Sequence, residues 1–310
     1  MKVIAFAGAA NWPIWAGLEA GTFASEGLDV SFALTPNSRQ MARDLYDGQA
    51  HIAFTSIDNV VAYVEGQGEE PLAGVPDFVA FLGMDDGLLS VVTQPDLPDA
   101  EPLTGRRASV DAPTTGFAFV LYELLARAGL GTPTIAGVGG GAARLEALLE
   151  RKHDATLLNA PLDMIAESHG CIRRVRATDV LGAYQGIVAA ARRRWLKENG
   201  PLASAFIRGL LEALAWLSDP ANAPAAKALL CARMPMLGAE VADRAYDLLV
   251  TDGGIRRDLS VDLAGVATVL DLRRRHGPSS APLADPAAYV DTTLLRALGQ
   301  ATRRPGPGPA

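Results

Sequence analysis

The residues that follow the first predicted strand are suited to hold a small planar molecule. An apolar run at residues 3–7 leads into Gly8-Ala9-Ala10-Asn11-Trp12-Pro13, and an apolar helical pattern comes next. Trp12 offers a flat apolar face and one N–H donor, while Asn11 offers donors and an acceptor. Loops at the carboxyl ends of strands often bind ligands in open α/β sheets. The alternative interpretation is a tryptophan half buried by its own helix.

Polar residues follow several other predicted strands and are candidates for the same site. Ser56 and Asn59 stand at a predicted helix start, where free N–H groups can bind an anion or a carbonyl oxygen. Thr114, Thr115 and Gly116 stand at another, and glycine there lets the backbone approach a ligand closely. The remaining candidates are Asp58, Asp85, Asp111, Asn159 and Asp163. For each aspartate taken alone, an N-cap or a solvated position is the competing explanation.

The charges of these loops favour a neutral or cationic, nitrogen-containing ligand, with aromatic compounds included. The loops contain aspartates but no Arg or Lys, which a sulfonate or nitrate ligand would favour. A helix N-terminus contributes only about 0.3–2 kcal/mol toward an anion, and the carboxylates oppose it. A cation over Trp12 would gain about 0.5–2 kcal/mol. The glycines at 139–141 are compatible with an anion cradle, but no second phosphate motif accompanies them, so a flexible loop is favoured.

Sequence signals for catalysis or metal binding are weak. Cys171, Cys231 and the four histidines show no metal-ligand spacing, and buried free thiols are favoured over a disulfide. There is no serine elbow of the hydrolase type, and His169 lies close to Cys171 but away from the predicted site. We therefore expect no catalytic residue, no metal and no cofactor. An enzyme that uses an aspartate as general base is the alternative.

Composition excludes some classes of function. A formal charge of -7 and a pI near 5.2 disfavour a nucleic-acid partner, and 49% hydrophobic residues supply a large core. No apolar run approaches the roughly 18 residues of a membrane span, so no membrane insertion is expected. The N-terminus is a poor secretory signal, because its apolar stretch runs directly into Asn11-Trp12-Pro13. As written, the sequence indicates a cytoplasmic protein, or a periplasmic one whose export signal was omitted.

Short apolar runs alternate with longer amphipathic ones, which is typical of βα units in a mostly parallel sheet. A loop at residues 94–103, rich in proline and acidic residues, separates two such series, and the chain is largely helical after residue 193. Predicted strands lie at residues 3–7, 28–34, 51–55, 78–84 and 88–93, and then at 107–110, 135–138, 155–159, 171–175 and 185–191.

The order of several motifs resembles one known family of binding proteins. The motifs are GLEAGTFASEGLDVSF at 17–32, LYDGQAHIAFTSIDN at 45–59, EGQG at 65–68, LTGRRASVDAPTTG at 103–116 and ALLERKHDATLLNAPLDM at 147–164. In combination they resemble the substrate-binding proteins of nitrate, sulfonate, taurine and thiamine-pyrimidine-precursor transporters, in the type II periplasmic-binding-protein-like superfamily. Yeast-type thiamine-pyrimidine synthases belong to the same superfamily. The resemblance covers residues 3–275.

The resemblance implies a two-lobed α/β fold with two hinge strands and a ligand cleft between the lobes. Mapped onto this chain, lobe one is 1–86 plus 188–310 and lobe two is 87–187. The hinges are then 86–93 and 184–188, and Tyr184 would close the far side of the cleft. The implied function is a solute-binding protein of an ABC-type uptake system, with a small-molecule ligand and an ABC permease as partners.

The resemblance also bears on the enzymatic alternative. The cysteine-rich iron motif of the yeast-type synthases is absent from this sequence, which speaks against that activity. The remaining enzymatic reading is a cytoplasmic, cofactor-free enzyme, decarboxylase-like or lyase-like, that uses the same cleft.

Overall fold

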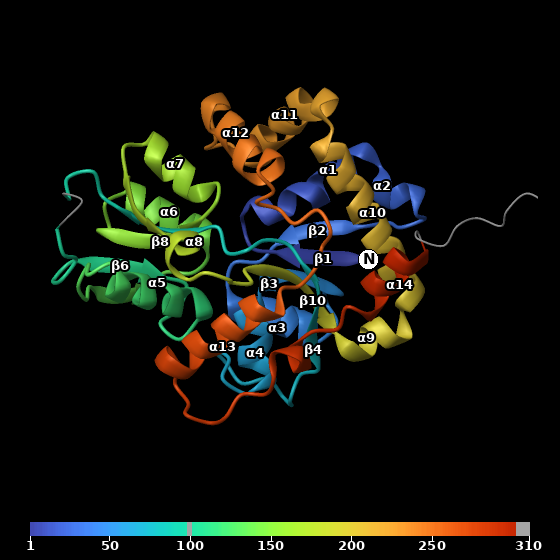
Figure 1. Cartoon of the computed structure of the whole chain (residues 1–310), viewed down its shortest axis with the longest axis horizontal. Coiled ribbons are helices and arrows are strands. Elements are labelled where there is room, and N and C mark those ends of the chain that lie inside the picture. Colours follow the sequence, from blue (N-terminus) through green and yellow to red (C-terminus); the bar gives the residue numbers. More distant parts are fainter. Residues whose placement is uncertain (98–100, 302–310) are drawn as a thin grey trace, which may run out of the picture.

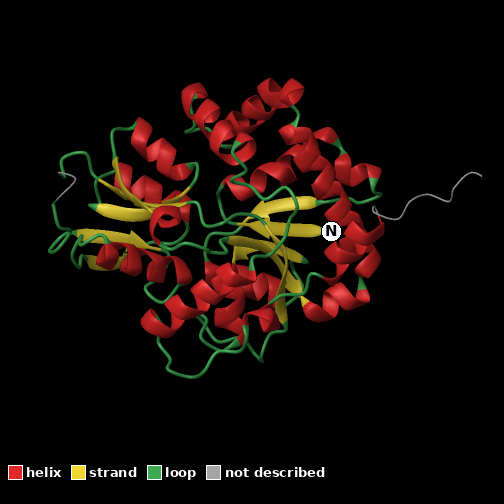
Figure 2. Ribbon diagram, in the orientation of Figure 1, coloured by secondary structure: helices red, strands yellow, loops and turns green. Residues whose placement is uncertain are grey.

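Two separate five-stranded sheets form the centres of two lobes (Figures 1 and 2). The computed structural model describes residues 1–97 and 101–301. In lobe one the strand order is β2 (Ser31–Leu34), β1 (Lys2–Ala5), β3 (Ile52–Ser56), β10 (Ile187–Arg192) and β4 (Phe78–Gly83). In lobe two it is β7 (Thr134–Gly137), β6 (Arg107–Val110), β8 (Ala155–Asn159), β5 (Leu89–Thr93) and β9 (Ile172–Arg176).

Each sheet contains one strand that runs against its neighbours. Strand β1 is parallel to β2 and β3, and β6 is parallel to β7 and β8, as expected for βα units. Strands β10 and β5 are antiparallel to both of their neighbours. These two strands directly follow the crossings between lobes. Because a crossing enters at the edge where the parallel strands end, the next strand must run in the opposite direction.

The two crossings lie side by side and are hydrogen-bonded to each other. The Gly186 N–H donates to Asp85 O at 3.0 Å, and the Met84 N–H donates to Ile187 O at 2.9 Å. The hinge predicted at 86–93 overlaps β5, which lies wholly in the sheet of lobe two. The division of the chain at 86/87 and 187/188 remains a proposal.

Helices cover both sheets. Lobe two carries α5 (Gly116–Arg127), α6 (Gly141–Leu149), α7 (Leu162–Ser168) and α8 (Ala177–Val180). Lobe one carries α1 (Trp12–Ala20), α2 (Thr22–Ser25), α3 (Ser38–Tyr46), α4 (Ile57–Val64), α9 (Arg193–Glu198), α10 (Gly200–Ser218), α11 (Ala223–Arg233), α12 (Ala239–Tyr246), α13 (Leu263–His276) and α14 (Thr293–Ala301). Short segments η1 (Ala9–Asn11), η2 (Pro220–Asn222), η3 (Asp247–Thr251) and η4 (Pro286–Tyr289) complete the helical structure. Within the described residues no helix is both long and apolar enough to cross a membrane.

Helix α13 joins the two lobes. It packs against α4 of lobe one and α5 of lobe two, and Figure 1 shows it between them. At its C-terminal end, Arg275 Nη1 lies 2.6 Å from a carboxylate oxygen of Glu123 on α5, and His276 Nε2 lies 3.0 Å from the other oxygen. The guanidinium of Arg273 lies over the Phe119 ring at 5.1 Å. These contacts hold lobe two against lobe one.

Both cysteines are free thiols, as the sequence favoured. Cys171 is buried, and Cys231 is partly buried.

Candidate functional site

A cavity lies between the lobes, at the edge where the parallel strands end. The volume open to the centre of a water molecule is about 50 Å³, several times the ~10–15 Å³ that one water needs. We call it the interlobe cavity. Its lining residues from lobe one are Phe6, Ala7, Gly8, Ala10, Asn11, Phe54, Ser56, Asn59 and Ile187. Those from lobe two are Asp111, Thr115, Gly116, Phe117, Gly140, Gly141, Arg144 and Asn159. Phenylalanine side chains and the glycine backbone therefore surround a small number of polar groups.

Four helices begin at the cavity, namely α1, α4, α5 and α6. Ser56 caps α4, because its hydroxyl oxygen accepts from the Asp58 N–H at 3.2 Å. Thr115 does not cap α5, since its hydroxyl donates to Ala112 O at 2.8 Å, and Gly140 offers α6 no side chain at all. The first N–H groups of α5 and α6 thus have no side-chain cap. Helix N-termini of this kind attract negative charge.

Glycines allow the two lobes to approach closely around the cavity. A Cβ atom on Gly8 would lie only 2.3 Å from Nδ2 of Asn159 on the other lobe. Across the cleft, the Gly140 N–H donates to Pro36 O at 3.3 Å. The two lobes therefore touch at the cavity, and Asn159 lies against the loop that follows β1.

The structure brings seven of the predicted site residues together. The residues that line the cavity are Asn11, Ser56, Asn59, Asp111, Thr115, Gly116 and Asn159. They come from both lobes and from four different strand ends, as the rule for open α/β sheets predicts. Their role in binding stays a prediction.

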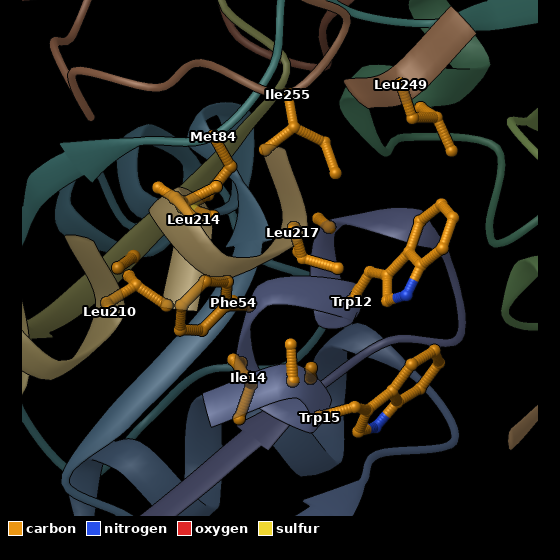
Figure 3. Packing of buried hydrophobic residues seen from close by; sticks show 14 of the residues in the cluster. Trp12, Ile14, Trp15, Phe54, Met84, Leu210, Leu214, Leu217, Leu249 and Ile255 are labelled. Atoms are coloured by element: carbon orange, nitrogen blue, oxygen red, sulfur yellow. The ribbon is translucent and has the colours of Figure 1, made fainter. Parts of the chain in front are cut away.

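Trp12 lies elsewhere than predicted. Its side chain is fully buried, Nε1 donates to Ala226 O at 3.2 Å, and its ring meets the edge of Tyr246 with centroids 6.0 Å apart. Figure 3 draws it with other members of the same core, among them Leu217 and Leu249. A ring enclosed in this way has no face left for a ligand, so the stacking role predicted for Trp12 is corrected. Its neighbour Asn11 does line the cavity, and Nδ2 of Asn11 donates to Phe6 O at 2.7 Å.

Asp58 is engaged in a buried ion pair rather than in the cavity. Arg273 donates through Nε to Oδ1 at 2.7 Å and through Nη2 to Oδ2 at 2.5 Å, and both side chains are 1% exposed. Gly116, at the start of α5, lies directly over this carboxylate, because an added Cβ would be 2.3 Å from Cβ of Asp58. The charge of Asp58 is thus compensated within lobe one.

Asp85 and Tyr184 belong to the crossings between lobes. One oxygen of Asp85 accepts from the N–H groups of Gly87 at 2.9 Å and Ile187 at 3.2 Å, and burial raises its pKa to about 6. It borders a smaller cavity next to the interlobe cavity. The Tyr184 ring is buried against Gly87, away from the interlobe cavity, and burial raises the pKa of its hydroxyl.

Asp163 and Thr114 are also engaged by protein groups. Asp163 accepts from the Ser90 hydroxyl at 2.8 Å and from the Met164 N–H at 2.9 Å, and Arg173 Nη2 lies 3.4 Å away. Thr114 donates its hydroxyl to Glu69 across the cleft. Neither residue lines the interlobe cavity. Of the four aspartates predicted to favour a cation, only Asp111 therefore lines the interlobe cavity.

Sequence reasoning missed Arg144, the basic residue of the cavity lining. Arg144 stands in the first turn of α6 and is 3% exposed. Nη1 donates to Leu157 O, while Nε is buried without a hydrogen-bond partner. Burial lowers the pKa of this guanidinium to about 10, and the charge of Asp111 acts in the opposite direction. The sequence-based candidates were loop residues, whereas Arg144 lies in the first turn of α6, directly after the glycines at 139–141.

Comparisons with known proteins bear on the fold of the chain. The family model described as NMT1/THI5 like matches residues 10–223, and a search of curated sequences gave no match. A protein of Bordetella bronchiseptica RB50 has a similar structure, with a TM-score of 0.79 at 22% identity over 98% of each chain. The periplasmic nitrate-binding protein NrtA from Synechocystis PCC 6803 gives 0.79 at 14% identity, over 98% of this chain and 89% of that one. A ligand-binding component of an ABC-type import system from Staphylococcus aureus, with zinc bound, gives 0.73 at 13% identity, over 96% and 97%. These likenesses show the two-lobed periplasmic-binding-protein fold.

Proposed function

The chain belongs to the NMT1/THI5-like family, and from this premise we propose that it is the solute-binding component of an ABC-type import system, acting in the periplasm. The single observation that carries the proposal is the cavity whose lining comes from both lobes. A ligand that contacts both lobes stabilises the closed form by its differential affinity. The closed form would then be the one that docks on the permease.

We further propose a small, nitrogen-containing ligand with a neutral or cationic group near Asp111. No hydrogen bond or ion pair within the described residues engages the Asp111 side chain, so its carboxylate is free to accept from a ligand N–H. Phe6, Phe54 and Phe117 supply apolar walls that suit a flat or aliphatic portion of the ligand. Amides of Asn11, Asn59 and Asn159 can fix its orientation, because an amide both donates and accepts.

The test begins with native mass spectrometry of the purified protein, followed by a thermal-shift screen of amines, pyrimidines, carboxylates and sulfonates. A true ligand at 100 times its dissociation constant adds about 2.7 kcal/mol to the free energy of unfolding. Asn159→Ala should weaken that response, since Asn159 lines the cavity. Asn222→Ala is the matched control, because its amide bonds Trp216 O at 3.0 Å outside the cavity lining.

The proposal fails if no compound stabilises the protein, or if both variants respond alike. Incubation of a stabilising compound with the protein, followed by NMR, separates binding from catalysis. Conversion of the compound at a rate proportional to protein concentration would replace the binding function with an enzymatic one.

A further inference from the structure

Two helices of lobe one reach lobe two on opposite sides of its sheet. Helix α12 packs against α7, and α13 packs against α5. Figure 1 shows the first contact above the strands of lobe two and the second below them. Both helices come late in the chain, after the second crossing between the lobes. Their contacts therefore join the lobes at two further places, away from the crossings.

The contact between α12 and α7 is centred on Glu167 of lobe two. Its Oε2 lies 2.6 Å from Nη2 of Arg244 on α12 and 2.6 Å from Nη2 of Arg173 on β9, in its own lobe. One carboxylate is thus shared by an arginine of each lobe. If the lobes separate, Glu167 loses Arg244 but keeps Arg173.

The contact between α13 and α5 has the same design, with Glu123 of lobe two at its centre. Arg275 and His276 of α13 lie 2.6 and 3.0 Å from its two oxygens, and Nε of Arg127 on α5 donates to it at 2.6 Å. Burial raises the pKa of Glu123, but the hydrogen bonds from these three side chains outweigh it and hold the pKa at about 2. Separation of the lobes leaves Glu123 with Arg127, and it leaves Arg275 with Asp271 at 2.8 Å.

Contacts built in this way can break without a large penalty. A buried glutamate that lost its only cation would be strongly destabilised, whereas each of these glutamates keeps an arginine of its own lobe. The two arginines of lobe one are already 39% and 45% exposed, so water can replace the carboxylate. Ion pairs with this exposure are individually weak and are screened by salt.

We propose that α12 and α13 form a two-sided ion-pair clasp, consisting of the pairs Arg244–Glu167 and Arg275–Glu123, that makes closure of the lobes dependent on ionic strength. The clasp goes beyond the proposed function, because it acts on the chain whether or not a ligand is present. At low salt it favours the closed form, and at high salt it releases lobe two. One consequence rests on the solute-binding function: a solute of any charge, or of none, is held less tightly at high salt, because the closed form is less populated.

The test measures the distance between the lobes in the ligand-free full chain. Lys152→Cys in lobe two and Glu212→Cys in lobe one replace exposed residues and carry nitroxide labels, after Cys171 and Cys231 are changed to alanine. Double electron–electron resonance then gives the distribution of distances. At about 1 M salt the Debye length is about 3 Å, against about 10 Å at 0.1 M. The wild type should show mainly the short distance at low salt, and a longer distance should gain population at about 1 M.

Arg244→Gln and Arg275→Gln remove the pairs between the lobes and leave each glutamate its own arginine. Each should lower the ratio of closed to open form by about 1.5- to 5-fold, the effect of an exposed ion pair. The double variant should show the product of the two factors, because the pairs share no partner among the residues that the structure describes. High salt should then have little further effect. Both arginines are partly exposed, so their replacement does not disturb a core.

Two controls remove similar ion pairs that do not join the lobes. Arg194→Gln breaks an exposed pair with Glu198 at 2.7 Å, within lobe one. Arg127→Gln takes from Glu123 its partner within lobe two and leaves Arg275 in place. Neither control should lengthen the distance at low salt.

A wild type that is already open at low salt overturns the inference, and so does a double variant with the distances of the wild type. A salt effect that persists undiminished in the double variant also overturns it, because charges elsewhere would then be responsible. None of these results depends on a ligand. The proposed function is therefore tested separately, by the thermal-shift screen, and either one can fail without the other.

Discussion

Replacement of Gly116 by alanine is a sharp test of how the lobes close. The new Cβ would lie 2.3 Å from Cβ and 2.6 Å from Oδ2 of Asp58, whereas real Cβ contacts essentially never fall below 3.0 Å. Asp58 cannot turn aside, because Arg273 holds both of its oxygens in a buried pair. The start of α5 must therefore move away from lobe one by more than half an ångström.

This movement raises the free energy of the closed form. Overpacking of a well-packed site costs about 1–3 kcal/mol, and a closed form penalised by that amount binds ligand about 5–150-fold more weakly. An open form in which α5 has moved away from Asp58 would carry no such penalty, so the thermal stability of ligand-free protein should then change less than the affinity. Titration calorimetry measures the affinity, and small-angle X-ray scattering with and without ligand measures the closure.

Gly238→Ala is the matched control for this prediction. Gly238 precedes α12 with φ at -75°, and an added Cβ would meet nothing within 4 Å. The control should bind and close like the wild type. If Gly116→Ala binds ligand with unchanged affinity and contracts to the same radius of gyration, then α5 does not lie on Asp58 in the ligand-bound form, and the reasoning is refuted.

Three further substitutions test single contacts. Trp12→Phe removes the hydrogen bond to Ala226 O and should lower the free energy of unfolding by about 0.5–1.5 kcal/mol in urea titrations. Ligand affinity should stay unchanged. A large loss of affinity without a loss of stability would show that Trp12 contacts the ligand. Asp85 has an ordinary pKa of 3.8 and a folded pKa of about 6, so its neutral form stabilises the protein below pH 4 and this contribution is lost as the pH rises through 6. Relative to Asp85→Asn, the wild type should therefore lose stability on the order of 3 kcal/mol between pH 4 and 6, and parallel pH profiles would contradict the raised pKa. Glu123→Gln removes the 2.6 Å ion pair with Arg275 that joins the lobes and should speed ligand release in stopped-flow experiments; an unchanged rate would show that this pair does not hold the closed form.

The order of strands and helices was predictable because it depends on local patterns. The alternation of β-branched runs and amphipathic runs placed the strands of both sheets. The positions of Asn11, Ser56 and Thr115 followed from the rule that ligands meet the carboxyl ends of strands. The direction of β5 and β10 was not predictable from pattern, since it depends on where the chain crosses between sheets.

The roles of Trp12 and Asp58 were hidden because their partners are remote in sequence. Ala226 and Arg273 lie 214 and 215 residues away from them, and nothing near residues 12 or 58 indicates either contact. An aspartate at a helix start looks the same in sequence whether it faces a ligand or a buried arginine. Arg144 was missed for a different reason, because a side chain in the first turn of a helix can reach a cavity that its own loop also borders.

The contact between Trp12 and Ala226 has a consequence for the order in which the protein matures. The loop after β1 is among the first segments to leave the ribosome, yet the groups that hold its tryptophan, Ala226 and Tyr246, are synthesised more than 200 residues later. At about 5–20 residues per second, translation alone separates the two by tens of seconds or less. A nascent chain that ends before α11 contains the whole cavity lining but not the groups that hold Trp12 next to it. The contacts that hold Trp12 are therefore complete only in a chain that extends through Tyr246.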